Sequence, residues 1–166
     1  MTAPERYRAA LEKGDLDAML ATLAPAVVLR SPITAAYVFD GFDDVAELMA
    51  VLFEDVGITD VEVTALITDG PTAALFHRAA VGGVRIEEAT LLRLDGEGLI
   101  SEIVLHIRPL PALAALVARL GPPMSRRRGR GKATVARAMG APLAVATRAG
   151  ERVVPWLLKR AGQPGR

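Results

Sequence analysis

The hydrophobic repeat of this sequence changes near Gly57 from the spacing of an α-helix to the spacing of a β-strand. Before Gly57, apolar residues recur every three to four positions, as on one face of a helix; after it, they alternate with polar residues. Glycine, proline and aspartate interrupt both patterns at the places where turns are expected. The expected helices span residues 2–14, 15–24, 42–56 and 110–120, and the expected strands span residues 26–30, 60–68, 72–81, 84–94 and 99–108. Helices followed by a long-stranded meander predict an α+β domain, with four to five strands and the helices on one face of the sheet.

Turn lengths predict which residues lie opposite each other on neighbouring strands. A two-residue hairpin at Gly82-Gly83 places Val81 opposite Val84 and therefore His77 opposite Glu88. Pairing Leu94 with Leu99 across the next turn places Thr90 opposite Ile103 and Glu88 opposite Leu105. Residues that lie opposite each other point to the same face of the sheet. One face is therefore mostly apolar and contains Leu75, His77, Ile86, Glu88, Thr90, Leu92, Ile103, Leu105 and Ile107. The other face collects Arg78, Arg85, Glu87, Arg93, Glu102, His106 and Arg108.

The apolar face is typical of a small-molecule site, because it combines hydrophobic side chains with a few convergent polar groups. His77 and Glu88 are neighbours there, and a carboxylate favours a charged imidazole while burial opposes both charges. One interpretation is a general base oriented by a carboxylate, which makes these two residues the catalytic candidates. The alternatives are a polar pair that only fixes the sheet register, or a bulge that turns both side chains outward.

Two segments and the order of the elements resemble the nuclear transport factor 2-like superfamily, and its SnoaL-like polyketide cyclase branch in particular. The first segment runs from Glu5-Arg6-Tyr7-Arg8 into Gly14-Asp15-Leu16-Asp17, and the second from Leu91-Leu92-Arg93-Leu94-Asp95-Gly96 through Glu102 to Ile107-Arg108-Pro109-Leu110. The resemblance covers about residues 3–120. It implies a cone-shaped, curved antiparallel sheet packed against three N-terminal helices, a pocket on the concave face, and a homodimer through the convex face. It leaves the reaction open, because one scaffold hosts isomerases, cyclases, hydrolases and non-enzymes.

The resemblance also argues against one activity. Ketosteroid isomerases of this superfamily use a tyrosine on the first helix, which Tyr7 matches, and two aspartates, whose positions hold Ser31 and Thr90 here. Neither Ser31 nor Thr90 ionises near neutral pH, so the proton shuttle is not expected. Ser31 has no base beside it in the sequence, so a nucleophilic role is not expected. Tyr7 either contacts a ligand or is a core aromatic residue. The expected pocket residues are Tyr7, Ser31, Leu75, Ile86, Thr90, Leu92, Ile103, Leu105 and Ile107.

Charge divides the chain into two unlike parts. Residues 1–122 contain 9 Lys/Arg and 18 Asp/Glu, whereas residues 123–166 contain 11 Lys/Arg and a single Glu. Because Gly121-Pro122-Pro123 is expected to stop a helix, we predict a SnoaL-like pocket domain over 1–120, a basic linker over 121–132 and a basic, amphipathic helical tail over 133–166.

Within the tail, residues 151–161 place Val153, Val154, Leu157, Leu158 and Ala161 on one helical face, with Trp156 at its flank. A basic amphipathic helix with an interfacial aromatic is typical of a segment that lies on an anionic membrane, here through residues 123–166. Two alternatives stay open: the tail folds back on its acidic domain, or it is disordered until a partner binds. Nucleic acid is not expected as a partner, because no aromatics interleave the arginines.

The composition excludes several classes of site. The chain has no cysteine, which removes disulfides, thiolate nucleophiles and cysteine zinc sites, and with two histidines no metal site or other cofactor is expected. No signal peptide or membrane-spanning run is visible, so we expect a cytoplasmic protein, peripheral to a membrane at most. Three functions remain: a binder of a small apolar or polyketide-like molecule, an acid–base enzyme using His77 and Glu88, and an interaction module that acts through its basic tail.

Overall fold

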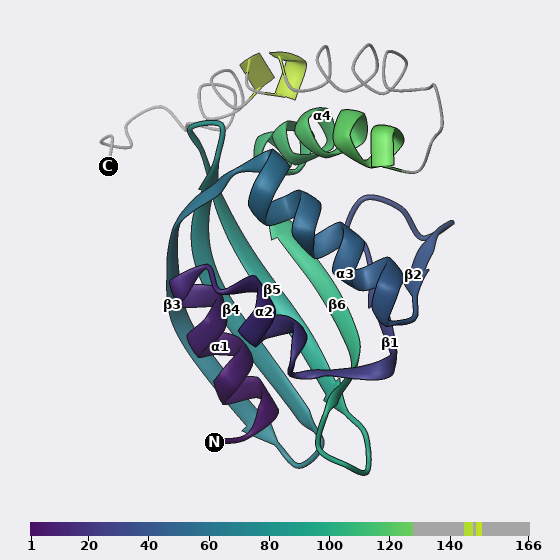
Figure 1. The fold of residues 1–166 in the computed structure, drawn as a ribbon. Helices are drawn as coiled ribbons and strands as arrows, with labels where there is room; N and C mark the ends of the chain where they lie inside the picture. Colours follow the sequence, from purple (N-terminus) through teal and green to yellow (C-terminus); the bar gives the residue numbers. More distant parts are fainter. Residues whose placement is uncertain (128–144, 148, 151–166) are drawn as a thin grey trace, which may run out of the picture.

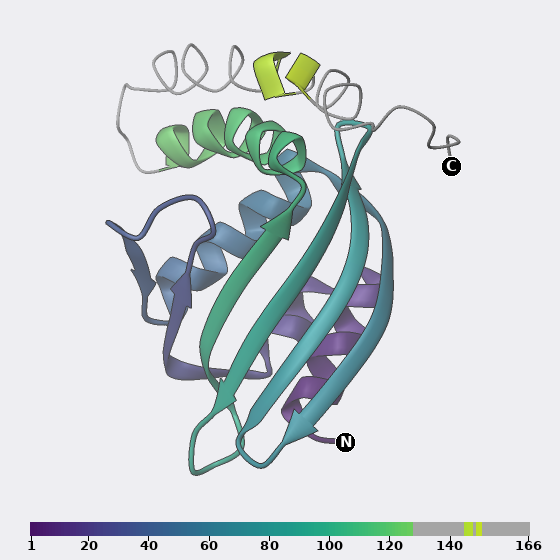
Figure 2. The same cartoon turned by 180° about the vertical axis from the view of Figure 1, so that it is seen from behind.

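The computed structural model describes residues 1–127, 145–147 and 149–150 of the chain. Its helices are α1 (Ala3–Lys13), α2 (Leu16–Leu20), α3 (Phe42–Ala50), the π-helical segment η1 (Val51–Val56) and α4 (Leu110–Arg127). Its strands are β1 (Leu23–Arg30), β2 (Val38–Asp40), β3 (Ile58–Asp69), β4 (Thr72–Val81), β5 (Val84–Leu94) and β6 (Ile100–Arg108). The strands form one curved sheet with α1, α2 and α3 on its concave side and α4 across one end (Figure 1). Figure 2 shows β3 to β6 from the convex side.

The predicted helix starts are confirmed by their capping bonds. The Glu5 amide donates to Thr2 Oγ1 at 3.4 Å, and the Thr2 amide donates to Glu5 Oε2 at 2.7 Å, which completes a capping box at α1. Gly14 ends α1 in the left-handed conformation, at φ 66°. Asp15 then caps α2 by accepting from the Ala18 amide at 3.0 Å. Each of these bonds joins residues three positions apart, so the helix starts depend on adjacent residues only.

The sheet has six strands in the order β2-β1-β6-β5-β4-β3, so the predicted count of four to five is wrong. The additional strand, β2, lies in a stretch that the sequence pattern left irregular, and it pairs with β1 through only three residues. The pair β1–β6 is parallel, whereas the other strand pairs are antiparallel. The sheet therefore has the expected α+β character but is not purely antiparallel.

The register predicted from the Gly82-Gly83 hairpin is confirmed: Val81 lies opposite Val84, and His77 lies opposite Glu88. The register predicted for the next pair is wrong by two residues. Thr90 lies opposite Leu105, because a bulge between Arg93 and Leu94 brings Leu94 opposite Ile100. A shift of two positions keeps each side chain on its face. The predicted inner residues Leu75, Ile86, Leu92 and Ile103 are accordingly buried, and the predicted outer residues Arg78, Arg85, Glu87 and Arg93 are exposed.

The helix that follows β2 changes type halfway. It is α-helical to Ala50 and π-helical from Val51 to Val56, where Gly57 ends it at φ 69°. A π-helical segment holds more residues per turn than an α-helix and occurs often at functional sites. Here it brings both Leu52 and Phe53 against the interior.

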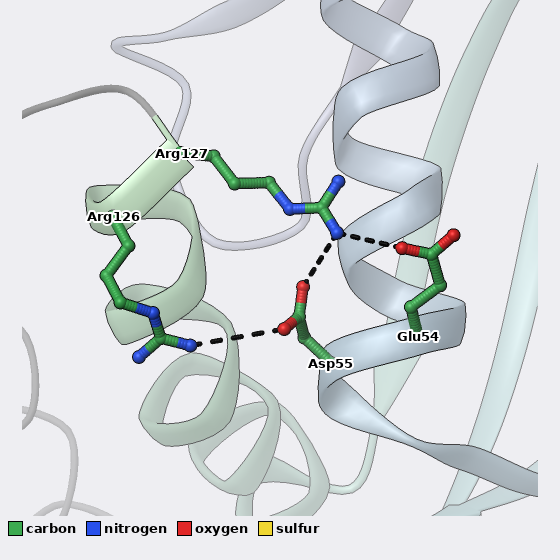
Figure 3. Close-up of polar contacts among 4 residues, drawn as sticks. All are labelled: Glu54, Asp55, Arg126 and Arg127. Atoms are coloured by element: carbon green, nitrogen blue, oxygen red, sulfur yellow. Dashed lines mark hydrogen bonds and ion pairs between the residues drawn. The ribbon is translucent and has the colours of Figure 1, made fainter.

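The predicted end of the last helix, at Leu120, is wrong. α4 continues through Pro122 and Pro123, which are both buried, to Arg127. Its last turn is fixed from outside: Arg127 Nη2 donates to Glu54 Oε2 at 2.8 Å and to Asp55 Oδ2 at 3.0 Å, and Arg126 lies 4.0 Å from Asp55 Oδ1 (Figure 3). Two prolines remove two helical hydrogen bonds, and the burial of both prolines together with these ion pairs acts against that loss.

Most of the predicted linker and tail, residues 128–144, 148 and 151–166, lies outside the described residues. The division into linker and tail, and the membrane contact through residues 123–166, therefore stay predictions. Among the helices that the structure describes, none is long and apolar enough to cross a membrane.

Candidate functional site

A small, largely enclosed cavity of about 60 Å³ lies between the concave face of the sheet and the helices. Seven residues predicted from the sequence for the pocket or for catalysis line it: Tyr7, His77, Ile86, Glu88, Thr90, Leu105 and Ile107. Leu75, Leu92 and Ile103 face the same side but are fully buried in the core and do not line the cavity. Ser31 lies elsewhere, in a surface loop beside Arg30, Pro32 and Thr34.

The rest of the lining comes from residues that sequence reasoning did not single out. These are Leu11, Met19, Leu29, Met49, Leu52, Phe53, Ile58 and Leu116. Met49 and Leu52 belong to the apolar stripe of the third predicted helix, so a signal for them existed in the helical period. Phe53 is one position off that stripe and reaches the cavity from the π-helical segment. No local pattern predicts that effect.

The polar end of the cavity is formed by His77 and Glu88, whose side chains are 8% and 15% exposed. His77 Nε2 lies 4.0 Å from Glu88 Oε2, which is an electrostatic contact and too long for a hydrogen bond. Thr90 Oγ1 donates to the other oxygen of the same carboxyl, Glu88 Oε1, at 2.9 Å. His77 Nδ1 is buried and has no hydrogen-bond partner among the described residues.

Burial is the main influence on the acidity of this cluster. It raises the pKa of Glu88 above its ordinary value, while the His77 imidazole, the Thr90 hydroxyl and the more distant His106 act in the opposite direction. Burial also raises the pKa of the Tyr7 hydroxyl, and the negative charge of Glu88 adds to that effect. The Tyr7 hydroxyl therefore keeps its proton, and Glu88 takes up a proton more readily than an exposed carboxyl.

This arrangement provides the elements of polar recognition and of proton transfer. Tyr7 offers an O–H donor, His77 offers an unused ring nitrogen, and Glu88 offers an oxygen that Thr90 does not occupy. A carboxyl with a raised pKa next to an imidazole also combines the two groups of an acid–base pair. Within the described part of the chain, no three His, Asp or Glu residues are grouped so that they could hold a metal ion.

A larger groove of about 340 Å³ lies at the surface between α4 and the β1–β2 segment. Ile33, Tyr37 and Phe39 line one side of it, and a row of α4 residues from Val117 to Ser125 lines the other. It contains no carboxyl or imidazole, so the acid–base candidates belong to the smaller, enclosed cavity.

Solved structures share this fold. A steroid delta-isomerase from Pseudomonas aeruginosa matches with a TM-score of 0.63 at 23% identity, over 76% of this chain and 89% of that one. An uncharacterised protein with a cystatin-like fold from Silicibacter pomeroyi DSS-3 matches with a TM-score of 0.64 at 21% identity, over 83% and 93% of the two chains. A protein described as a polyketide cyclase, from Sinorhizobium meliloti, matches with a TM-score of 0.53 at 16% identity, over 63% and 93%.

These identities show a common fold and no more. No curated protein matches the chain. The sequence model of the SnoaL-like domain matches residues 5–103, which is more than half of the chain and includes α1, the cavity-lining parts of β4 and β5, and part of β6. The protein has the nuclear transport factor 2-like fold and belongs to the SnoaL-like domain family.

Proposed function

We propose that the enclosed cavity binds a small, mainly apolar molecule with one oxygen-containing polar group. The observation that supports this most directly is His77 Nδ1, a buried atom of a cavity-lining residue, which has no hydrogen-bond partner among the described residues. Buried polar atoms in native proteins almost always have a partner, so an unpaired one at a cavity wall indicates where a ligand atom binds. The rest of the lining is almost entirely apolar.

The size of the cavity restricts the ligand. A volume of about 60 Å³ holds a few water molecules, whereas sites for drug-sized ligands measure about 300–1,000 Å³. A polyketide-like molecule fits only if lining side chains move. Met19, Met49, Leu52 and Phe53 form the helical side of the cavity, and methionine adapts its shape readily. The small volume favours a compact molecule such as a small cyclic ketone or alcohol.

Binding can be tested with cyclopentanone and with cyclopentane, which has the same ring but no oxygen, by NMR titration of the full chain. His77→Phe removes the ring nitrogens and keeps an aromatic side chain. We expect it to weaken cyclopentanone binding by about tenfold, the effect of one hydrogen bond, and to leave cyclopentane binding nearly unchanged. His106→Phe is the matched control, because His106 is exposed on the opposite face of the same sheet. Equal effects of the two substitutions, or no binding of either compound, would contradict the proposal.

The second candidate is an acid–base enzyme, which is favoured by the raised pKa of Glu88 and by the imidazole 4.0 Å away. A general base in the cavity would remove a proton from the carbon next to the carbonyl group of a bound ketone. Deuterium exchange of cyclopentanone in D₂O measures that step separately from binding. If the protein is an enzyme, the wild-type chain speeds up the exchange, and Glu88→Gln abolishes this effect while cyclopentanone still binds. A pure binder gives the uncatalysed rate with both.

A further inference from the structure

The surface groove beside α4 is apolar and has the form of a site for a helix. Its α4 wall consists of Val117, Leu120, Gly121 and Met124, whose spacing of three and four residues places them in one row along the helix. The opposite wall includes Ile33 and Tyr37, which are 37% and 41% exposed. Grooves of this kind receive amphipathic helices, whose apolar side chains recur at the same spacing.

The strand side of the groove borders on acidic residues. The Tyr37 hydroxyl donates to Asp44 Oδ2 at 3.0 Å, and the same oxygen accepts from the Asp40 amide at 3.3 Å. Asp43 is exposed in the first turn of α3, next to Asp44. A segment that combines an apolar stripe with positive charge therefore matches this groove in both respects.

The chain leaves the described domain beside the groove. Met124 and Ser125 line it, and the next two residues, Arg126 and Arg127, are held against Glu54 and Asp55 (Figure 3). The 23 residues between Arg127 and Glu151 tether the later segment to this end of the domain, and of these the structure describes residues 145–147 and 149–150.

We propose that residues 151–161 of the same chain dock in this groove. Val154, Leu157 and Leu158 supply apolar side chains at helical spacing, while Arg152, Lys159 and Arg160 supply the positive charge that suits the acidic side. The segment is covalently tethered, so its effective concentration at the groove is high and it competes well with external partners. This inference does not depend on what the enclosed cavity binds.

Trp156 is the only tryptophan in the chain, so its fluorescence reports on this segment alone. In the full chain we expect emission at shorter wavelength than for free tryptophan amide, and quenching by acrylamide that is severalfold weaker. Ile33→Asp puts a charge in the groove, and Leu157→Asp puts one on the segment. Each should return emission and quenching to the values of an exposed tryptophan. Ile67→Asp is the control, because Ile67 is 60% exposed on β3 and does not line the groove.

Circular dichroism confirms that each variant is folded, and Leu157→Asp leaves the described domain untouched. Exposed Trp156 in the wild-type chain would overturn the proposal, as would equal effects of Ile33→Asp and Ile67→Asp. A signal that depends on protein concentration would assign the groove to a second copy of the chain. A blue shift that appears only after adding phosphatidylglycerol vesicles would assign the segment to a membrane surface. Either result would also overturn docking within one chain.

Discussion

Glu88 is subject to opposing influences on its proton. Burial favours the neutral carboxyl, while His77 and the hydrogen bond from Thr90 Oγ1 favour the charged form, and the net effect is a raised pKa. The folded chain therefore binds this proton more tightly than the unfolded chain does. The resulting contribution to stability is fully present below the pKa of the unfolded state and is lost as the pH rises through the folded pKa.

Glu88→Gln keeps the shape and the acceptor for Thr90 but cannot ionise. We expect the free energy of unfolding of the variant, minus that of the wild type, to rise as the pH increases through the folded pKa of Glu88. The rise is about 1.4 kcal/mol for each unit by which the folded pKa exceeds the unfolded one. Urea unfolding at a series of pH values measures it. Glu87→Gln is the comparison, since it removes a carboxyl that is half exposed on the outer face of the same strand. A flat difference for Glu88→Gln would show that burial does not raise this pKa.

The neighbourhood of His77 and Glu88 could be predicted because it depends on a single two-residue turn. Ser31 could not be placed in the same way. Its position depends on the loop that leads into β2, and β2 pairs with β1 through three residues that have no strong alternation. The pair of Thr90 with Leu105 was also beyond prediction, because nothing in the local sequence marks the bulge at Arg93.

At the scale of elements, the predictions based on caps and hairpin glycines are confirmed, whereas the rule that proline ends a helix is wrong for α4. Capping bonds and positive-φ turns are local, so they depend on a few adjacent residues. The continuation of α4 through Pro122 and Pro123 depends on burial and on Arg127, which contacts residues more than 70 positions away in the sequence. The π-helical segment likewise depends on tertiary packing and not on a local sequence signal.

The hairpin that fixes the β4–β5 register gives a prediction at this scale. Gly83 has φ 75°, and a Cβ added there would meet no atom within 4 Å, so Gly83→Ala introduces backbone strain without a clash. We expect it to lower the free energy of unfolding by about 1–2 kcal/mol, the cost of the left-handed conformation for an L-residue. Gly96→Ala is the matched control, because Gly96 also lies in an open turn but not at positive φ. Chemical denaturation of both variants gives the comparison, and equal losses would contradict the argument.

At the scale of the molecule, the change of hydrophobic period near Gly57 was sufficient to predict the α+β class, and the register of the Gly82-Gly83 hairpin predicted the face that carries the cavity. The convex face carries ion pairs, with Glu102 between Arg30 and Arg93 at 2.8 and 2.9 Å, and Phe76 is 38% exposed. The homodimer through this face stays a prediction. The boundary of the pocket domain at residue 120 also stays a prediction, although α4 extends beyond that residue.

Fragments of different length test where the pocket domain ends. Residues 1–127 retain all of α4, with 11 Lys/Arg against 18 Asp/Glu, and we expect this fragment to fold cooperatively as an acidic domain. Ending the chain after residue 122 removes Pro123, which is buried, and Met124, which packs against both parts of the core. That loss of apolar burial should lower the free energy of unfolding by about 1–3 kcal/mol relative to residues 1–127.

Urea unfolding of the two fragments beside the full chain measures this difference. Equal stability of the fragments ending at 122 and 127 would place the end of the pocket domain at the Gly-Pro-Pro sequence. The full chain should in turn be more stable than residues 1–127, because docking of residues 151–161 stabilises only the folded state. Adding Leu157→Asp to the full chain should remove that increment without affecting the fragments, which separates the contribution of the groove from the contribution of the last turn of α4.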